Sequence, residues 1–300
     1  MTARRSRTSD AAPTAPVTVV VATLNRREEL RGTLGRLTRL PERPPVVVVD
    51  NGSADGTAAM VAARFPQVTL VRLRENRGAC ARNIGVRLAR TPYVAFSDDD
   101  SWWEPYSLAR AADLFDRHAR LGLLVARLRT GEAGRTDPVS LKMASAPLGR
   151  DADLPGPSVL GFPACAAVVR RTAFLSVGGF DALLFFGGEE SLLAVDLAAA
   201  SWGLAYVSAV QARHLPSPLR EAPARRWSLH QRNDVLVHWM RLPLRDAARR
   251  TATLAGRAVR DPAAARALCG LLRRLPGGIA RRRPVPRSVV RGLAVLGELR

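Results

Sequence analysis

The sequence has few cysteines, no long uncharged apolar run and no leader-like start, and each shortage excludes a class of protein. The three cysteines, Cys80, Cys165 and Cys269, are odd in number and far apart, so neither a disulfide framework nor a zinc knuckle is expected. No uncharged apolar run reaches the roughly 18 residues that suggest a membrane-spanning helix. The first residues also lack the apolar stretch of a signal peptide. We therefore expect a reduced, cytoplasmic, soluble protein.

Lysine is nearly absent, and the arginines are concentrated at one end of the chain. Lys142 is the only lysine among 46 basic residues, which together with 26 acidic residues give a net charge of +20. This preference for arginine suggests a GC-rich bacterial genome. Residues 223–300 hold 18 arginines against four acidic residues, a net charge of +14. The basic character thus belongs to the C-terminal segment rather than to the main body.

Composition divides the chain into three segments. Residues 1–15, rich in Arg, Ser, Ala and Pro, predict a flexible tail. Residues 16–222 carry alternating strand and helix patterns, and residues 223–300 predict an Arg-rich helical extension. The prolines expected to break that extension into separate helices are Pro243, Pro262 and Pro276.

The main body alternates β-branched runs with amphipathic segments. The expected strands are 17–22, 46–49, 68–73, 93–97, 164–170 and 204–207. The expected helices are 27–39, 54–64, 78–90, 106–118, 171–177 and 189–202. Between 101 and 160 the pattern loosens, apart from one helix. This alternation predicts an α/β fold with a mostly parallel central sheet and helices on both faces.

A polar segment directly follows each of the first four expected strands. The segments are Thr23–Arg26, Asp50–Ser53, Glu75–Gly78 and Asp98–Asp100. Because the carboxyl ends of parallel strands share one edge, where open α/β folds bind ligands, we expect these segments to line one crevice.

Three adjacent carboxylates, Asp98 to Asp100, repel one another unless a cation shares them. Mg²⁺ and Mn²⁺ suit such oxygen ligands, together with substrate phosphates. An acidic loop that only caps the next helix is the alternative.

Asn76 to Gly78 and Arg82 suit a diphosphate, because glycine permits close approach and a helix N-terminus and an arginine attract anions. A loop with a solvated arginine is the alternative. No G-x-G-x-x-G follows the first strand and no G-x-x-x-x-G-K-[ST] occurs, which argues against a dinucleotide oxidoreductase and a P-loop NTPase.

Glu189 and Glu190 open an expected helix, where a carboxylate can act as a general base or simply stabilise the helix terminus. His214 follows the last expected strand, and a lone histidine there is either structural or a ligand. Trp102 and Trp103, beside the acidic triplet, suit either sugar stacking or the core.

In combination, these segments resemble bacterial family 2 glycosyltransferases of the GT-A (Rossmann-like) fold. The resemblance covers about residues 16–217, and its motifs occur in the family's order. They are Val19–Arg26, Val47–Ser53, Asp55–Thr57, Asn76–Gly78, Ala81–Asn83, Phe96–Asp100, Gly178–Asp181 and Glu189–Glu190. It departs from the family at Glu190, where the usual Glu-Asp pair would place an aspartate.

The resemblance implies a role for each matching residue. The nucleotide-sugar would be bound by Thr23, Asn25, Arg26, Asp50, Asn76, Gly78, Arg82 and Asp98. Mn²⁺ or Mg²⁺ would be bound by Asp98, Asp100 and His214, and the general base would be Glu190, with Glu189 as the alternative.

The activity it implies is transfer of a sugar, with inversion, from a UDP- or dTDP-sugar to a hydroxyl of a glycan, lipid-linked or secondary-metabolite acceptor. The alternatives are an inactive nucleotide-sugar-binding protein and a sugar nucleotidyltransferase.

The basic extension has three possible roles. Apolar residues such as Trp227, Leu236 and Met240 alternate with arginines, as in a helix that lies on an anionic membrane at the inner face of the cell. The alternatives are packing against the main body with a solvated arginine face, and binding of nucleic acid. We expect no nucleic-acid partner, because no recognised nucleic-acid module accompanies the charge.

Overall fold

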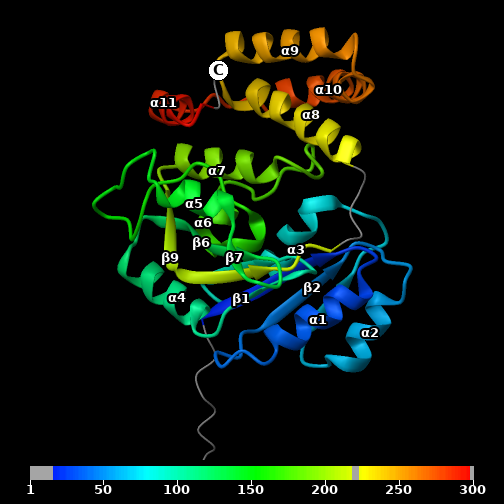
Figure 1. The fold of residues 1–300 in the computed structure, drawn as a ribbon, viewed down its shortest axis with the longest axis vertical. Helices are drawn as coiled ribbons and strands as arrows, with labels where there is room; N and C mark the ends of the chain where they lie inside the picture. The colour runs from blue at the N-terminus through cyan, green and yellow to red at the C-terminus, as the bar shows by residue number, and fades with distance from the viewer. Residues whose placement is uncertain (1–15, 218–222, 298–300) are drawn as a thin grey trace, which may run out of the picture.

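A curved nine-stranded sheet runs through the protein, with helices on both of its faces and a further helical layer above them (Figure 1). The computed structural model describes residues 16–217 and 223–297. The expected N-terminal tail, residues 1–15, and the expected boundary near residue 222 lie outside these ranges.

The sheet has a parallel half and a mixed half. Its strands are β1 (Val17–Thr23), β2 (Val46–Asp50), β3 (Thr69–Arg72), β4 (Tyr93–Ser97), β5 (Ser101–Trp103), β6 (Leu121–Thr130), β7 (Arg135–Thr136), β8 (Ala167–Arg170) and β9 (Gly203–His214). Their order is β3-β2-β1-β4-β8-β6-β9-β5, with β7 paired to β6. The first four strands are parallel, β8 is antiparallel to both of its neighbours, and β6 and β9 are parallel.

Alternate residues of β1 pack against opposite layers of helices. Val17, Val19 and Val21 face one apolar core, and Val20 faces the other. The first core receives α1 (Arg27–Leu37), α2 (Thr57–Arg64) and α4 (Ser107–Arg117). The second receives α3 (Ala81–Leu88), which follows the 3₁₀ turn η1 (Gly78–Cys80), and also α6 (Arg171–Ser176) and α7 (Glu189–Ala199). The predicted α/β class is therefore confirmed.

The sequence pattern missed the ordered part of residues 101–160. That segment holds β5, β7, α5 (Pro138–Ala144) and β6, a ten-residue strand in the middle of the sheet. Leu121 to Ala126 are all buried, and such a short apolar run cannot be distinguished from helix by its periodicity. The expected strand at 164–170 begins instead with a 3₁₀ turn, η2 (Ala164–Ala166), and the expected strand at 204–207 is the start of the much longer β9.

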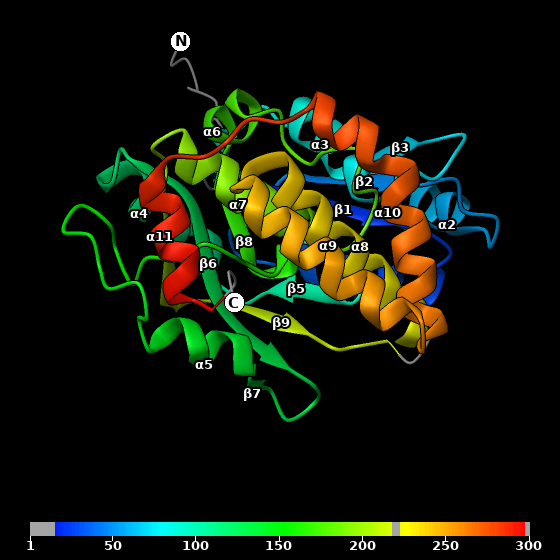
Figure 2. The same cartoon turned by 90° about the horizontal axis from the view of Figure 1, so that it is seen from above.

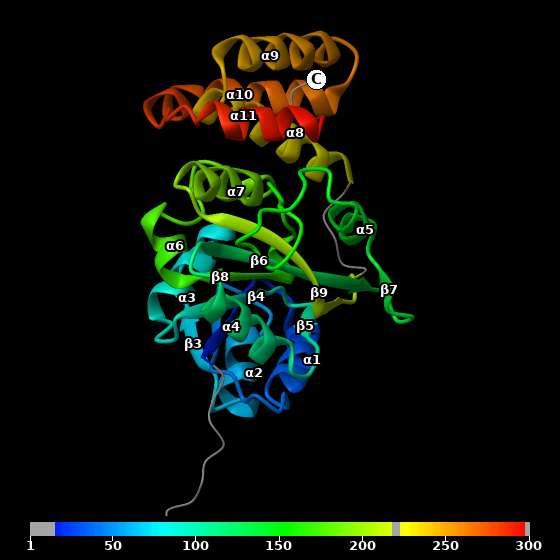
Figure 3. The ribbon, with the colours of Figure 1, turned by 90° about the vertical axis from the view of Figure 1, so that its left-hand side faces the viewer.

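The C-terminal segment forms a layer of helices over α7 (Figures 1 and 3). Its helices are α8 (Pro223–Arg241), α9 (Leu244–Ala258), α10 (Pro262–Ala280) and α11 (Arg287–Val295). Figure 2 looks down onto this layer. Pro243 and Pro262 flank helix starts as expected, but Pro276 lies inside α10 and does not end it, which corrects the prediction for that proline.

The apolar side of α8 is covered by protein. Leu236 and Met240 are fully buried and share a core with Leu184, Leu192 and Leu271. The residues that suggested a membrane-surface helix therefore include several that pack inside the molecule. No helix in the described ranges is long and apolar enough to cross a bilayer.

An ion pair joins the helical layer to the main body. Arg241 of α8 binds both carboxylate oxygens of Asp196 on α7 and donates to the carbonyl oxygen of Arg281 at 2.8 Å. The exposed fraction of the side chain is only 7% for Arg241 and 17% for Asp196. Because a lone buried charge is costly, each partner depends on the other.

Replacing Arg241 with methionine is expected to lower the free energy of unfolding by about 3 kcal/mol, since it leaves a mostly buried carboxylate unpaired. Urea denaturation measures this loss. The control Arg245→Met, whose side chain is 87% exposed, is expected to change it by less than about 0.5 kcal/mol. Equal effects of the two variants would show that the ion pair does not anchor the layer.

Candidate functional site

A cavity of about 720 Å³ lies at the carboxyl edge of the parallel strands, between the sheet, α7 and the helical layer. Most of the residues expected to form the site line it: Thr23, Arg26, Asn76, Gly78, Arg82, Asp98, Asp100, Glu189, Glu190 and His214. The four polar segments that follow β1 to β4 therefore do meet, as the parallel arrangement requires.

Asn25 and Asp50 do not line this cavity. The Asn25 side chain accepts a hydrogen bond from the backbone N–H of Ala54 at 2.8 Å, and Asp50 is fully buried and accepts one from the N–H of Ser53 at 2.9 Å. The second carboxylate oxygen of Asp50 is buried and has no hydrogen-bond partner. Contacts of Asn25 and Asp50 with a nucleoside stay predictions.

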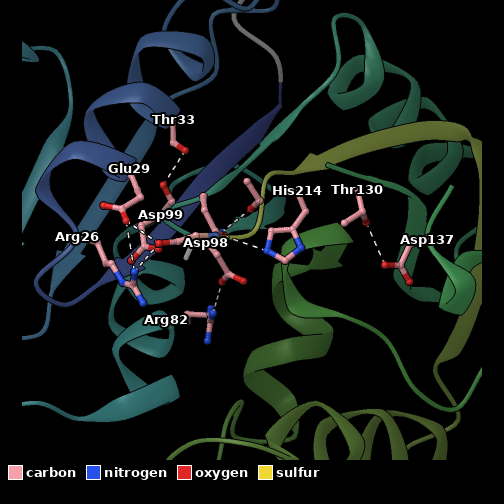
Figure 4. A network of polar contacts seen from close by, with 12 residues as sticks. Arg26, Glu29, Thr33, Arg82, Asp98, Asp99, Thr130, Asp137 and His214 are labelled. Atoms are coloured by element: carbon pink, nitrogen blue, oxygen red, sulfur yellow. Dashed lines mark hydrogen bonds and ion pairs between the residues drawn. The ribbon is translucent and has the colours of Figure 1, made fainter. Parts of the chain in front are cut away.

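The three aspartates after β4 have different partners. Figure 4 labels two of them, Asp98 and Asp99, together with Arg82 and His214. Asp98 accepts a hydrogen bond from Arg82 of α3 at 2.5 Å, and Asp99 accepts one from Thr23 at 3.2 Å. The Nε2 atom of His214 lies 3.2 Å from an oxygen of Asp100. Burial, reinforced by repulsion from the two neighbouring carboxylates, raises the pKa of Asp99 to about 7.

Arg82 is the cation at the centre of this edge. It is 6% exposed, and although this burial lowers its pKa, Asp98 and the two glutamates of α7 more than offset the effect and raise the pKa above its usual value. The centre of the Phe180 ring lies 5.9 Å from its guanidinium carbon. A buried arginine in this position is fixed toward the cavity and suits an anionic ligand.

Asp100 and His214 are the pair best suited to a divalent cation. They are adjacent because β5 and β9 pair with Ser101 opposite His214. Within the described ranges, no group of three or more His, Cys, Asp or Glu side chains is arranged to hold a metal. The chain thus offers a carboxylate and an imidazole in contact, which fits a cation that takes its remaining ligands from water and substrate phosphates.

Two carboxylates that line the cavity begin α7. Glu189 is 2% exposed, and one of its oxygens has no hydrogen-bond partner, whereas Glu190 is half-buried. Burial, and repulsion from Glu189, raise the pKa of Glu190 to about 7. Burial also raises the pKa of Glu189, although Arg82 opposes the shift. A carboxyl poised near neutral pH suits proton transfer.

A residue of the helical layer fixes the loop that leads into α7. The side-chain amide of Asn233 on α8 is fully buried and donates to the carbonyl oxygens of Leu184 at 2.9 Å, Phe186 at 3.0 Å and Gly187. Gly187 and Gly188 have φ of 84° and 89°, which favours glycine. Asn233 therefore helps to set the position of both glutamates.

Neither tryptophan beside the acidic triplet lines the cavity. Trp103 is fully buried in the core, and the Trp102 ring lies under the guanidinium of Arg36, 4.3 Å from its centre. Of the two roles that the sequence left open, sugar stacking and core packing, the structure supports core packing for Trp103.

Comparison with known proteins identifies the family and the fold. The sequence model described as glycosyl transferase family 2 matches residues 18–178, more than half of the chain. The chain belongs to glycosyl transferase family 2. It is a glycosyltransferase, and the family predicted from the sequence is confirmed.

A relative of this glycosyltransferase is the N-acetylglucosaminyl-diphospho-decaprenol L-rhamnosyltransferase of Mycobacterium tuberculosis. It is 28% identical over 273 residues, which cover 76% of this chain and 87% of the relative. The succinoglycan biosynthesis protein ExoO of Rhizobium meliloti is 40% identical, but over only 33% of this chain and 30% of its own length.

Solved structures share the GT-A fold of this glycosyltransferase. The mannosyltransferase PcManGT from Pyrobaculum calidifontis, in complex with GDP-Man and Mn²⁺, has a TM-score of 0.58 at 20% identity and covers 97% of this chain and 84% of its own. S. aureus TarS 1–349 in complex with UDP-GlcNAc has a TM-score of 0.56 at 19% identity, covering 74% and 66%. The match to the longer TarS chain covers 39% of that chain.

Sequence reasoning missed the part of the cavity that the helical layer supplies. Arg225, Arg226, Leu229, His230, Arg232 and Arg274 line it. The sequence pattern places these residues only within the basic helical extension, for which membrane contact, packing and nucleic-acid binding were the possible roles. The only local signal was the charge of the segment, which does not show where its side chains point.

The Glu190→Gln variant of this glycosyltransferase is expected to keep donor binding and to lose transfer by about 100-fold or more, because an amide cannot accept the proton. The measurement is the rate of sugar transfer, or of slow donor hydrolysis by water. In the unchanged protein this rate is expected to rise with pH through about 7, since below that pH Glu190 is protonated. Glu189→Gln is the matched control; an active Glu190→Gln beside an inactive Glu189→Gln would reassign the base.

Proposed function

We propose that this glycosyltransferase moves a sugar from a nucleotide-sugar to an acceptor hydroxyl in one in-line displacement that inverts the anomeric carbon. The observation that carries the proposal is that Arg82, Asp98 and Asp100 of the sheet edge and Glu190 of α7 line the same cavity. A donor held at the sheet edge would present its anomeric carbon to a hydroxyl activated by Glu190.

The donor would be held at the edge of the sheet. Arg82 would bind the diphosphate, with Asn76 and Gly78 beside it, and Thr23, Asn25 and Asp50 would lie near the ribose and base. Asp98 would reach the ribose when Arg82 turns toward the diphosphate. UDP- and dTDP-sugars are the donor classes we favour, because the residues resemble the family members that use them.

Asp100 and His214, together with Asp98, would hold Mn²⁺ or Mg²⁺. When bound, such a cation neutralises the charge that develops on a leaving diphosphate. Two Mn²⁺-containing structures of the same fold support this choice of cofactor. Glu190 would take the proton of the acceptor hydroxyl as the new bond forms, with Glu189 as the alternative base.

A lipid-linked glycan is the acceptor that the relatives favour. The mycobacterial relative is named for a diphospho-decaprenol-linked sugar, and its similarity extends into the helical layer of this chain. The outer surface of that layer exposes Leu244, Arg245 and Val259, which suits peripheral contact with an anionic membrane at its cytoplasmic face.

A thermal-shift panel tests the donor and the metal together. UDP-, dTDP- and GDP-sugars are each tested with Mn²⁺, Mg²⁺ or EDTA. A ligand selective for the folded state stabilises it by about 2.7 kcal/mol at a hundredfold excess over its Kd. One donor class is expected to raise the Tm only with metal, and Asp100→Ala is expected to abolish that rise. Asp113→Ala, a change of an exposed aspartate on α4, is the control and is expected to retain it.

The absence of any shift would count against the proposed donor site. A shift with one donor class but no transfer of its sugar to any acceptor or to water would favour an inactive nucleotide-sugar-binding protein. Release of pyrophosphate from a nucleoside triphosphate and a sugar phosphate would identify a nucleotidyltransferase instead. Tight binding of the donor by Asp100→Ala without metal would refute the proposed metal ligands.

A further inference from the structure

The helical layer turns a cluster of arginines toward the cavity. Arg226 and Arg232 come from α8, and Arg274 comes from α10. Within residues 16–217 and 223–297, no carboxylate lies within ion-pairing distance of these three guanidinium groups. The other arginines that the structure buries at the base of the layer or in the main body, such as Arg241 and Arg82, do have carboxylate partners.

Arg232 is held rigidly and remains uncompensated. It is 6% exposed, and its guanidinium donates to the carbonyl oxygen of Leu184 at 2.9 Å and to Asn233 at 2.9 Å. Its stem fits against Gly270 of α10, where an added Cβ would lie 2.9 Å from Cδ of Arg232. Burial and the neighbouring Arg274 lower the pKa of Arg232 to about 10. A buried cation that neighbours another cation is costly unless an anion completes the site.

The position of these arginines indicates which anion would complete the site. Arg274 donates to the carbonyl oxygen of Leu183 at 3.2 Å, and Arg232 donates to that of Leu184, so both are attached to the loop that leads into Glu189 and Glu190. In that loop, an added Cβ on Gly187 would lie 3.2 Å from the ring of His230. The layer's cations are therefore bound to the loop that carries the base, whereas Arg82 and Asp98 belong to the sheet edge, where we propose that the donor binds.

We propose that Arg232 and Arg274, with Arg226 and His230, form a subsite for the phosphate or diphosphate of a phosphorylated acceptor. The planar, forked donors of arginine match phosphate oxygens. An acceptor held there by its phosphate would extend its sugar hydroxyl toward Glu190. The proposal rests on the proposed function and narrows it, because it favours phosphate-linked acceptors over neutral glycans and secondary metabolites.

Calorimetric titration with inorganic pyrophosphate in EDTA tests the subsite without requiring turnover or metal. The full chain is expected to bind pyrophosphate, and Arg274→Gln and Arg232→Gln are each expected to weaken the affinity about tenfold or more. Arg273→Gln is the matched control, because Arg273 is the exposed neighbour on α10, does not line the cavity and changes the net charge equally. Arg274 is half-buried and donates to one carbonyl oxygen, that of Leu183, so its replacement disturbs the fold less than that of Arg232. Arg274→Gln therefore keeps the test valid if Arg232→Gln does not fold.

The outcomes separate this subsite from the donor site. Equal affinities in Arg274→Gln and Arg273→Gln, or a loss confined to Arg82→Gln, would overturn the proposal even if donor binding is confirmed. Failure of every nucleotide-sugar to stabilise the protein would instead refute the proposed function. The pyrophosphate titration would still show whether the arginines bind a phosphate.

Farnesyl diphosphate, as a second titrant, is expected to bind at least as tightly as pyrophosphate and to lose affinity in the same variants, which would identify a lipid-linked acceptor. Binding of pyrophosphate alone would support the subsite for a water-soluble phosphorylated acceptor.

Discussion

Repulsion among five carboxylates around one cavity is the constraint on which the site depends. Asp98, Asp99, Asp100, Glu189 and Glu190 all line it. Burial disfavours the charged form of each carboxyl group, and repulsion from neighbouring carboxylates adds to this effect. Together they raise the pKa of Asp99 and of Glu190 to about 7. The chain offsets part of this charge with one buried cation on the sheet side, Arg82. At the sheet edge the three aspartates still outnumber the two arginines that line the cavity there, Arg26 and Arg82, so this part of the cavity suits a divalent cation beside a diphosphate leaving group.

The helical layer completes the site. Its apolar face rests on α7 through Leu184, Leu192 and the residues of α8 and α10, and the Arg241–Asp196 pair fixes its position. In this position, arginines of α8 and α10 line the same cavity as the five carboxylates. Part of the net charge of +14 in residues 223–300 therefore faces inward, toward ligands, and only the remainder forms a solvated surface.

Local sequence patterns predicted the parallel half of the sheet and most of the polar residues at its carboxyl edge. The features that they missed depend on contacts between segments far apart in the sequence. β1, β2 and β4 are apolar runs, β3 is a short strand with an apolar centre, and polar segments follow all four, so their positions and the convergence of Thr23, Asn76 and Asp98 follow from the sequence. β6 was missed because a buried apolar run resembles a buried helix segment. Asn233 was missed because nothing in a helical sequence shows that one amide will meet three carbonyl groups some 46 to 49 residues earlier in the chain.

The same contacts imply that the position of the base and the binding of the acceptor are coupled. Asn233 holds the loop at Leu184 to Gly187, and the adjacent Arg232 donates to the same Leu184 carbonyl. A ligand that engages Arg232 would therefore act on the loop whose end determines where Glu190 lies. Because Gly187 and Gly188 have left-handed φ values and contact α8 closely, larger residues there would strain the loop and push the helix away. An acceptor bound at the proposed arginine subsite would thus stabilise the loop conformation in which the base can act. The loop before α7 would then link recognition of the acceptor to catalysis.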